Sequence, residues 1–283
     1  MSVEKLTARN ALRGLTVGIS VSDSADLPLL GLSPKHADLA LGEIVRAIVI
    51  GGGSIVYGGH IRPGGFTHSV IREVTRYGFD SCLTLCLSAP EHRSSSIEEI
   101  REVDSALGDN GRLLLLDEFG KETPISVGSG NKVDKFPSEA QQRTAMREYA
   151  AKMCGARVLV GGQLSHFRGP LPGIVEEAKM AIDRLTPLYI AGGFGGAAAL
   201  VAHSVGIDSF DWAPEDFPVL GDTTSRSELT AYIRDAQSQS GWTTALARID
   251  EKAQQKLAAS HRPGEIASLV SRGLAELSSW GSQ

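Results

Sequence analysis

The sequence contains little cysteine, and it has no long apolar run. Only Cys82, Cys86 and Cys154 occur among 283 residues, too few for a disulfide framework, so we interpret them as small core residues of a protein from a reducing compartment. No stretch approaches the roughly 18 consecutive apolar residues of a membrane-spanning helix. The first ten residues carry charges and lack the apolar core of a signal peptide. We therefore expect a cytoplasmic protein without a membrane contact.

Several functional signatures are also missing. The net charge is −5 and no run of lysine or arginine occurs, so binding to a nucleic-acid backbone is not favoured. The seven histidines show no metal-ligand spacing with cysteines or carboxylates, and we predict no metal. No glycine loop continues into Gly-Lys-Ser or Gly-Lys-Thr, and no Gly-x-Gly-x-x-Gly follows the first predicted strand. A Walker-type nucleotidase and an ordinary NAD dehydrogenase are therefore disfavoured.

What the sequence does contain is an alternation of short apolar runs and helical-period segments, from Leu15 to about Ser204. This pattern is typical of repeated β-α units. It predicts an α/β fold that is Rossmann-like, with a mostly parallel sheet, helices on both faces and a C-terminal helical appendage. The predicted strands are Leu15–Val21, Ser54–Tyr57, Cys82–Leu87, Leu113–Leu116, Arg157–Val160 and Leu188–Ile190.

Helix signals fill the spaces between these strands. Ser33 is placed as an N-cap with Pro34 at the first helical position. Further helices are predicted over Phe66–Tyr77, Ile97–Leu107, Ser138–Met153 and Leu171–Leu185, and in an alanine-rich stretch ending near Val205. The segment Glu118–Lys135 has no period, so we interpret it as a loop on the active face or a flexible insertion.

The chain is expected to divide into two parts. Residues 1–205 form the predicted nucleotide-binding domain, and residues 206–283 form a helical extension of two or three helices packed on the same domain. The tryptophans of the extension, Trp212, Trp242 and Trp280, are interpreted as core or interface anchors.

Three predicted strands run directly into paired glycines, which are Gly58-Gly59, Gly161-Gly162 and Gly192-Gly193. We refer to residues 58–65 as the first glycine loop, to 161–162 as the second and to 192–196 as the third. In a parallel sheet these strand ends meet at one edge, where open α/β folds bind ligands. Glycine lets a phosphate approach the backbone, and a following helix N-terminus offers unpaired amides. The recurrence predicts a phosphorylated nucleotide as the ligand.

Several side chains near these loops have two possible roles. Arg62, His60 and Arg168 could bind phosphate or stack on a base, or they could be solvated loop residues. Glu176 and Glu177 could bind ribose hydroxyls or act as a base, or they could simply favour a helix N-terminus. Ser22 and Asp23 follow the first strand, where they could bind phosphate or form an Asx turn.

Taken together, the motifs Ile55–Thr67, Val160–Gly162 with Pro172–Glu177, and Tyr189–Gly196 resemble the SLOG superfamily, which groups DprA-like and LOG proteins with sensor domains of bacterial defence systems. The resemblance implies a Rossmann-like nucleotide pocket of the kind proposed to sense ADP-ribose-type nucleotides. In Thoeris-type antiviral systems a related domain binds a cyclic ADP-ribose signal that a TIR enzyme makes from NAD. This chain carries no recognisable TIR domain, so the resemblance implies a standalone sensor, a component acting with a separate effector or TIR protein, or an enzyme.

One departure from the LOG enzymes bears on catalysis. Their motif Pro-Gly-Gly-x-Gly-Thr-x-x-Glu, aligned on the third glycine loop, places Ala191 at the proline, Gly196 at the threonine and Ala199 at the catalytic glutamate. A LOG-type glycosidase is therefore doubtful. Glu176, Glu177 and Arg168 remain the catalytic candidates.

The resulting expectation is a sensor of an ADP-ribose-like or cyclic ADP-ribose-like nucleotide that forms a homo-oligomer and needs no further cofactor. The alternative is a LOG-like or deoxyribosyltransferase-like enzyme that acts on an N-glycosidic bond. A DprA-like DNA-binding module is the weakest reading. The predicted ligand-binding residues are Ser22, Asp23, Gly58, Gly59, His60, Arg62, Gly64, Gly65, Phe66, Thr67, Gly161, Gly162, Arg168, Gly173, Glu176, Gly192, Gly193, Phe194, Gly195 and Gly196.

Overall fold

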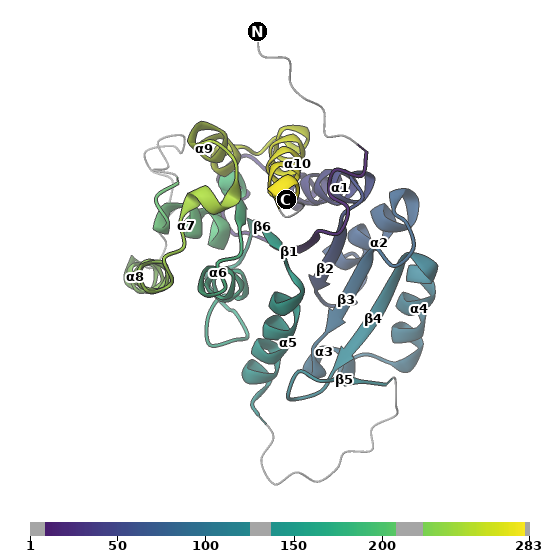
Figure 1. Ribbon diagram of the computed structural model, residues 1–283. Coiled ribbons are helices and arrows are strands. Elements are labelled where there is room, and N and C mark those ends of the chain that lie inside the picture. Colours follow the sequence, from purple (N-terminus) through teal and green to yellow (C-terminus); the bar gives the residue numbers. More distant parts are fainter. Residues whose placement is uncertain (1–8, 125–136, 208–222, 281–283) are drawn as a thin grey trace.

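A seven-stranded sheet forms the centre of the protein (Figure 1). The structure is a computed structural model that describes residues 9–124, 137–207 and 223–280. The strand order is β5-β4-β3-β2-β1-β6-β7, parallel throughout except for the antiparallel pair β4 and β5. The strands are β1 Thr16–Ser22, β2 Ser54–Gly58, β3 Leu83–Leu87, β4 Gly111–Leu116, β5 Glu122–Thr123, β6 Ala156–Gly161 and β7 Leu188–Ala191.

All six predicted strands are confirmed, each within two residues of its predicted ends. The structure adds β5, which lies in the segment Glu118–Lys135 where we expected a loop. Asp117 accepts hydrogen bonds from the backbone N–H of Phe119 and Lys121, both at 2.9 Å, and this turn brings Glu122 and Thr123 back along β4. A strand of two residues is too short to show a period. Residues 125–135 of the predicted loop lie outside the described residues.

The predicted helices are present, and the first of them begins at its predicted cap. They are α1 Pro34–Ile50, α2 Phe66–Tyr77, α3 Ala89–Arg93, α4 Ile97–Leu107, α5 Glu139–Met153, α6 Gly173–Asp183, α7 Gly196–Ser204, α8 Thr223–Ser240, α9 Glu251–Ala259 and α10 Pro263–Trp280, with 3-10 turns at 108–110, 192–194 and 244–247. Ser33 is the N-cap of α1, with Pro34 at its first position. Ser138 caps α5 in a box with Gln141, which satisfies free amides of the first turn. The short helix α3 has no counterpart in the predictions.

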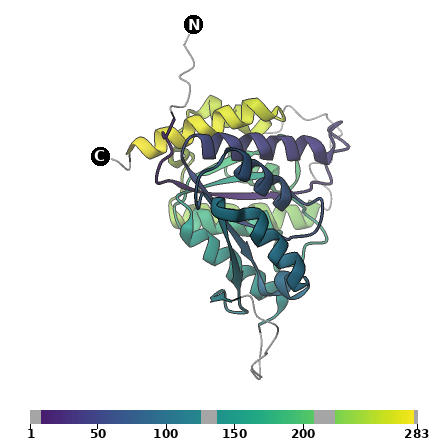
Figure 2. The same ribbon diagram turned by 90° about the vertical axis from the view of Figure 1, so that its right-hand side faces the viewer.

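Helices cover both faces of the sheet, which confirms the predicted Rossmann-like α/β architecture. Figures 1 and 2 show the helices on the two sides of the sheet. Helices α1, α2, α4, α9 and α10 contribute to one apolar cluster, α6, α7 and α8 contribute with Ala258 of α9 to a second, and α5 packs in a third. Burial of apolar surface in these layers is the main favourable contribution to folding.

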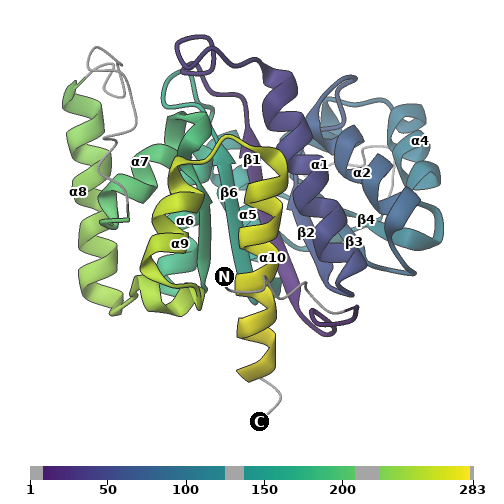
Figure 3. The same cartoon turned by 90° about the horizontal axis from the view of Figure 1, so that it is seen from above.

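The C-terminal helices pack directly on the sheet layers. Helix α10 lies along α1, where Ile266 and Val270 share a buried cluster with Leu41 and Ile44 (Figure 3). Trp242, two residues after the end of α8, is 1% exposed and donates its indole N–H to the Thr186 carbonyl at 3.0 Å. Its expected role as a core anchor is therefore confirmed. Trp212 and the side chain of Trp280 lie outside the described residues.

The sheet has a topological switch point between β1 and β6. From β1 the chain continues to β2 on one side, and it later returns to place β6 on the other side. At such a point the connections leave in opposite directions, which opens a crevice at the carboxyl ends of the two strands. Because doubly wound folds bind ligands in this crevice, the topology indicates a ligand site at the ends of β1 and β6.

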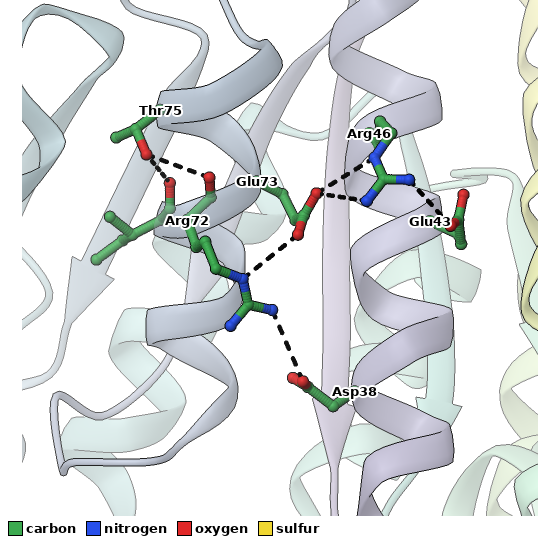
Figure 4. Close-up of polar contacts among 7 residues, drawn as sticks. Asp38, Glu43, Arg46, Arg72, Glu73 and Thr75 are labelled. Carbon is green, nitrogen blue, oxygen red and sulfur yellow. Dashed lines mark hydrogen bonds and ion pairs between the residues drawn. The ribbon is translucent and has the colours of Figure 1, made fainter.

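Helices α1 and α2 are joined by a network of side-chain ion pairs around Glu73, which is 5% exposed (Figure 4). Arg46 donates to Glu73 Oε2 from Nη2 at 2.9 Å and from Nε at 3.3 Å. Arg72 Nε donates to Oε1 of the same carboxylate at 3.4 Å. The carboxylate of Glu73 thus holds a guanidinium from each helix, and Arg46 also lies 4.7 Å from the centre of the Tyr77 ring.

We predict that Glu73→Ala lowers the free energy of unfolding by about 2 kcal/mol, because it removes a buried carboxylate that is bonded to two guanidinium groups. The matched control is Glu43→Ala, since Glu43 pairs with the same Arg46 but its side chain is 41% exposed. That change should cost no more than about 0.5 kcal/mol. Urea denaturation measures both values, and equal losses would contradict a special role for Glu73.

Candidate functional site

A cavity of about 350 Å³ opens at the switch point. Its walls come from the end of β1, the end of β2 with the first glycine loop, the start of α3, the inner face of α5, and the β6–α6 loop with the start of α6. We call it the switch-point cavity. Its volume falls within the range of about 300–1,000 Å³ that is usual for small-molecule sites.

The structure brings together about half of the residues predicted from the sequence. Those that line the switch-point cavity are Ser22, Asp23, Gly58, Gly59, His60, Arg62, Phe66, Arg168, Gly173 and the catalytic candidate Glu177. Others support the same walls without lining them, namely Gly64, Gly65, Thr67, Gly161 and Glu176. Gly65 is the N-cap of α2, and Thr67 Oγ1 donates to the His60 carbonyl at 2.5 Å, which closes the first glycine loop onto the helix.

The third glycine loop is placed differently. Gly192, Gly193 and Phe194 are buried and do not line the switch-point cavity. A Cβ atom on Gly193 would lie 2.2 Å from the Ser260 carbonyl oxygen, so this glycine permits close contact with the chain between α9 and α10. Packing therefore accounts for Gly193, and a ligand role for it stays a prediction.

The N-terminus of α7, which follows the third glycine loop, already holds a carboxylate. Asp26 Oδ2 accepts the Gly196 N–H at 2.6 Å, and Asp26 is 8% exposed. A Cβ on Gly195 would lie 2.5 Å from the Asp26 side chain. A carboxylate of the protein thus stands where an anion would be favoured by the helix dipole.

Two arginines of α5 were not predicted as site residues. Arg143 and Arg147 lie four residues apart with Met146 between them, and all three line the switch-point cavity. Their spacing was a usable signal, because residues at i, i+3 and i+4 share one helix face and this face is otherwise directed at the sheet. No local pattern connects α5 with the first glycine loop, which lies far away along the chain.

Arg147 is held in place by Glu176. The two side chains form an ion pair, and Thr144 Oγ1 donates to the other carboxylate oxygen of Glu176 at 2.5 Å. Gly173 leaves room for this guanidinium, since a Cβ there would lie 2.7 Å from Arg147 Nη2. Glu176 is 5% exposed and does not line the cavity. It therefore orients Arg147 from behind the cavity wall, and a ligand-binding role for it stays a prediction.

Arg143 and Arg168 meet at Glu91, the third unpredicted charged residue of the cavity wall. Arg143 Nη2 lies 3.3 Å from Glu91 Oε1, and Arg168 Nη1 lies 3.9 Å from the same oxygen. The side chain of Arg143 is 10% exposed, whereas that of Arg168 is 57% exposed. Arg143 is therefore fixed in the wall, and Arg168 stands at the rim.

Glu177 faces the cavity while a buried arginine holds one of its oxygens. Arg157 Nη1 donates to Glu177 Oε1 at 3.1 Å and to Ser20 Oγ at 2.8 Å, and Arg157 is 2% exposed. Among the described residues, no hydrogen bond reaches Glu177 Oε2. Of the two glutamates considered from the sequence, Glu177 is the one that lines the cavity.

Two helix N-termini and one unpartnered hydroxyl also face this space. Helices α2 and α6 have no side-chain cap, and their first residues, Phe66 and Gly173, line the cavity. Ser88 lies in the wall with 0% exposure, and its hydroxyl has no hydrogen-bond partner within the described part of the chain. A buried polar group without a partner is costly, so this hydroxyl favours a polar ligand atom or water beside it.

His60 is set up as a neutral hydrogen-bond donor. Burial lowers the pKa of His60, opposed by the nearby Glu91 carboxylate. Its Nδ1 accepts the Arg62 N–H at 3.3 Å, so the proton of the neutral ring lies on Nε2. Burial also raises the pKa of the Tyr57 hydroxyl in the same wall, which keeps that group protonated.

The described residues contain no group of three or more His, Cys, Asp or Glu side chains that could hold a metal ion. In the same residues, none of the helices is both long enough and apolar enough to cross a bilayer.

Comparison with known proteins gives one match. A protein-family model described as SLOG cluster2 matches residues 11–264. The match includes α8 and α9 and so extends beyond the segment from Leu15 to Ser204 that carries the glycine motifs. Searches of curated proteins and of solved structures found no match to the chain. Because the family match covers most of the sequence, and the fold and the switch-point cavity agree with it, the chain belongs to the SLOG superfamily, in the group described as SLOG cluster2.

Proposed function

We propose that the protein is a sensor that binds an ADP-ribose-like or cyclic ADP-ribose-like nucleotide in the switch-point cavity. Membership of the SLOG superfamily supports a nucleotide-related role. The observation that carries the proposal is the convergence of four guanidinium groups and two uncapped helix N-termini on one cavity at the switch point.

The charges of the wall favour a phosphorylated ligand. Four arginines line the cavity, Arg62, Arg143, Arg147 and Arg168, against three carboxylates, Asp23, Glu91 and Glu177. Arginine donates paired hydrogen bonds that match phosphate oxygens. The helix N-termini add partial positive charge and unpaired N–H groups.

The remaining wall can bind the sugar. Glu177 Oε2 and Asp23 are acceptors for ribose hydroxyls, and the Ser88 hydroxyl and His60 Nε2–H supply further hydrogen-bonding atoms. Phe66 and Phe167 add aromatic surface next to these polar groups. Polar groups for phosphate and sugar beside aromatic rings are the chemistry that a nucleotide site requires.

Binding is tested by thermal shift and calorimetry with ADP-ribose, cyclic ADP-ribose isomers, NAD, AMP and ATP. A ligand present at 100 times its Kd stabilises the folded state by about 2.7 kcal/mol, which gives a clear rise in melting temperature. We expect the rise with ADP-ribose or a cyclic isomer. No shift with any of these at millimolar concentration would refute the proposal.

We further predict that Arg62→Ala weakens binding of the stabilising nucleotide about tenfold, because one charge-assisted hydrogen bond to phosphate is lost. Arg62 is exposed and forms no ion pair among the described residues, so folding should be unaffected. Arg101→Ala, an exposed site on α4 away from the cavity lining, is the matched control and should bind like the parent protein. Equal affinities for all three proteins would remove Arg62 from the site.

A second candidate function is cleavage of an N-glycosidic bond, and the position of Glu177 favours it. Ala199, which aligns with the catalytic glutamate of LOG enzymes, is 1% exposed and lies outside the cavity lining. An acid-base carboxylate in this cavity would therefore have to be Glu177, Asp23 or Glu91, and Glu91 is already paired with Arg143. Oε1 of Glu177 is held by Arg157, which leaves Oε2 to meet a ligand hydroxyl.

We predict that incubation with AMP, cytidine monophosphate and NAD releases no free base at a catalytic rate. General acid-base assistance contributes about 10²–10⁴-fold to a rate, and the residue that would supply it in a LOG enzyme is missing. Chromatography of the reaction products is the measurement. Steady release of base that disappears in Glu177→Gln, with unchanged folding, would replace the sensor by the enzyme.

A further inference from the structure

A second cavity of about 720 Å³ lies beside the switch-point cavity. Its walls come from the turn after β1, the β6–α6 loop and the inner face of α8. Phe167 lines both cavities, so the two spaces meet at its ring. Phe167 is 39% exposed, which leaves the ring accessible to a ligand.

The two cavities differ in chemistry. The walls of the second cavity are mostly apolar and include Leu164, Leu171, Leu229 and Tyr232. Its charged lining residues are the carboxylates Asp26 and Glu228 against one guanidinium, Arg226, whereas the switch-point cavity has four guanidinium groups against three carboxylates. A phosphate is therefore favoured in the switch-point cavity and disfavoured in the second.

Asp26 strengthens this difference. Its Oδ2 accepts the Gly196 N–H at the start of α7, so the positive end of that helix is already neutralised. Among the described residues, the only hydrogen bond to the Asp26 carboxylate is this one to Oδ2. Oδ1 can therefore accept a hydrogen bond from the amino N–H of a ligand, but it would repel a phosphate.

We propose that the second cavity binds the heterocyclic base of the nucleotide whose phosphates lie in the switch-point cavity. An amino-bearing aromatic ring such as adenine would stack against Phe167 or Tyr232, fill the apolar space and donate its amino N–H toward Asp26. The inference rests on the proposed function, and it defines the ligand as a two-part molecule that spans Phe167.

The test fills the second cavity and leaves the switch-point cavity unchanged. Ala25 and Ser165 are exposed and line only the second cavity, so Ala25→Trp and Ser165→Trp should block it without disturbing the core. Phe167→Ala removes the shared ring. Leu39→Trp is the matched control, since Leu39 is 60% exposed and lines neither cavity.

Calorimetry then compares ADP-ribose and cyclic ADP-ribose with ribose 5-phosphate, which has no base. We expect the three cavity variants to bind the base-containing probe that the parent binds at least about tenfold more weakly. The two tryptophan variants, Ala25→Trp and Ser165→Trp, should bind ribose 5-phosphate with the affinity of the parent protein. Leu39→Trp should match the parent with every probe.

The outcomes separate the two proposals. If the parent protein binds a base-containing probe and the tryptophan variants bind it equally well, the second cavity does not hold the base, and this inference fails while the proposed function stands. That result would also be expected if the cavity held a segment of a partner protein. If neither nucleotide binds the parent protein, the proposed function fails, and this inference fails with it.

Discussion

Gly193→Ala should lower the free energy of unfolding by at least about 3 kcal/mol, because the added methyl group would meet backbone and not a movable side chain. A Cβ at this position lies 2.2 Å from the Ser260 carbonyl oxygen and 2.4 Å from the carbonyl carbon. The chain between α9 and α10 would have to move away from the sheet. Denaturant unfolding followed by circular dichroism measures the loss.

Gly264→Ala is the matched control for Gly193→Ala. Gly264 lies at the start of α10, and a Cβ there meets no atom within 4 Å. Its stability should change by no more than about 0.5 kcal/mol, since alanine also favours the helix. If Gly193→Ala proved as stable as Gly264→Ala, the third glycine loop would not be a packing element, and a ligand role for it would gain weight.

Arg147→Met should weaken nucleotide binding by about 100-fold, more than any other single change in the switch-point cavity. The substitution removes a guanidinium from the wall and also leaves the Glu176 carboxylate without its ion partner behind that wall. The uncompensated negative charge would repel phosphate. Arg147→Met should also lower the free energy of unfolding by about 3 kcal/mol, which is the usual cost of removing one partner of a buried ion pair.

The double variant Arg147→Met with Glu176→Met separates these two effects. It removes both charges and should recover most of the lost stability, because a buried ion pair replaced by apolar groups is often neutral. Its nucleotide affinity should stay low, since the guanidinium is still absent. Calorimetry and urea denaturation measure the two quantities. If affinity returned together with stability, Arg147 would be a structural residue and not a ligand-binding one.

The sequence alone determined the elements of this fold and many of their ends. Strands such as β1 and β6 are short apolar runs bounded by turns, and the start of α1 follows from Ser33 and Pro34, because periods and caps are local properties of the chain. It also placed the first and second glycine loops at strand ends, and with them Asp23, His60 and Arg62. The strand β5 was not predicted, because a strand of two residues is too short to show an alternating pattern.

Only the tertiary structure decided which of these residues face one space. It placed β6 beside β1, and so brought Arg143 and Arg147 of α5 to the first glycine loop, although no local pattern links these segments. It turned Glu177 toward the cavity and Glu176 behind Arg147, a difference of one helix position that the sequence left open. It also packed Gly193 against Ser260, whereas the sequence pattern predicted the same ligand role for all three glycine loops. The physical reason is that a glycine in the sequence indicates only that something approaches the backbone closely, and a charged residue indicates only that it needs a partner. Whether a ligand, another chain segment or a counter-ion fills that place depends on long-range packing.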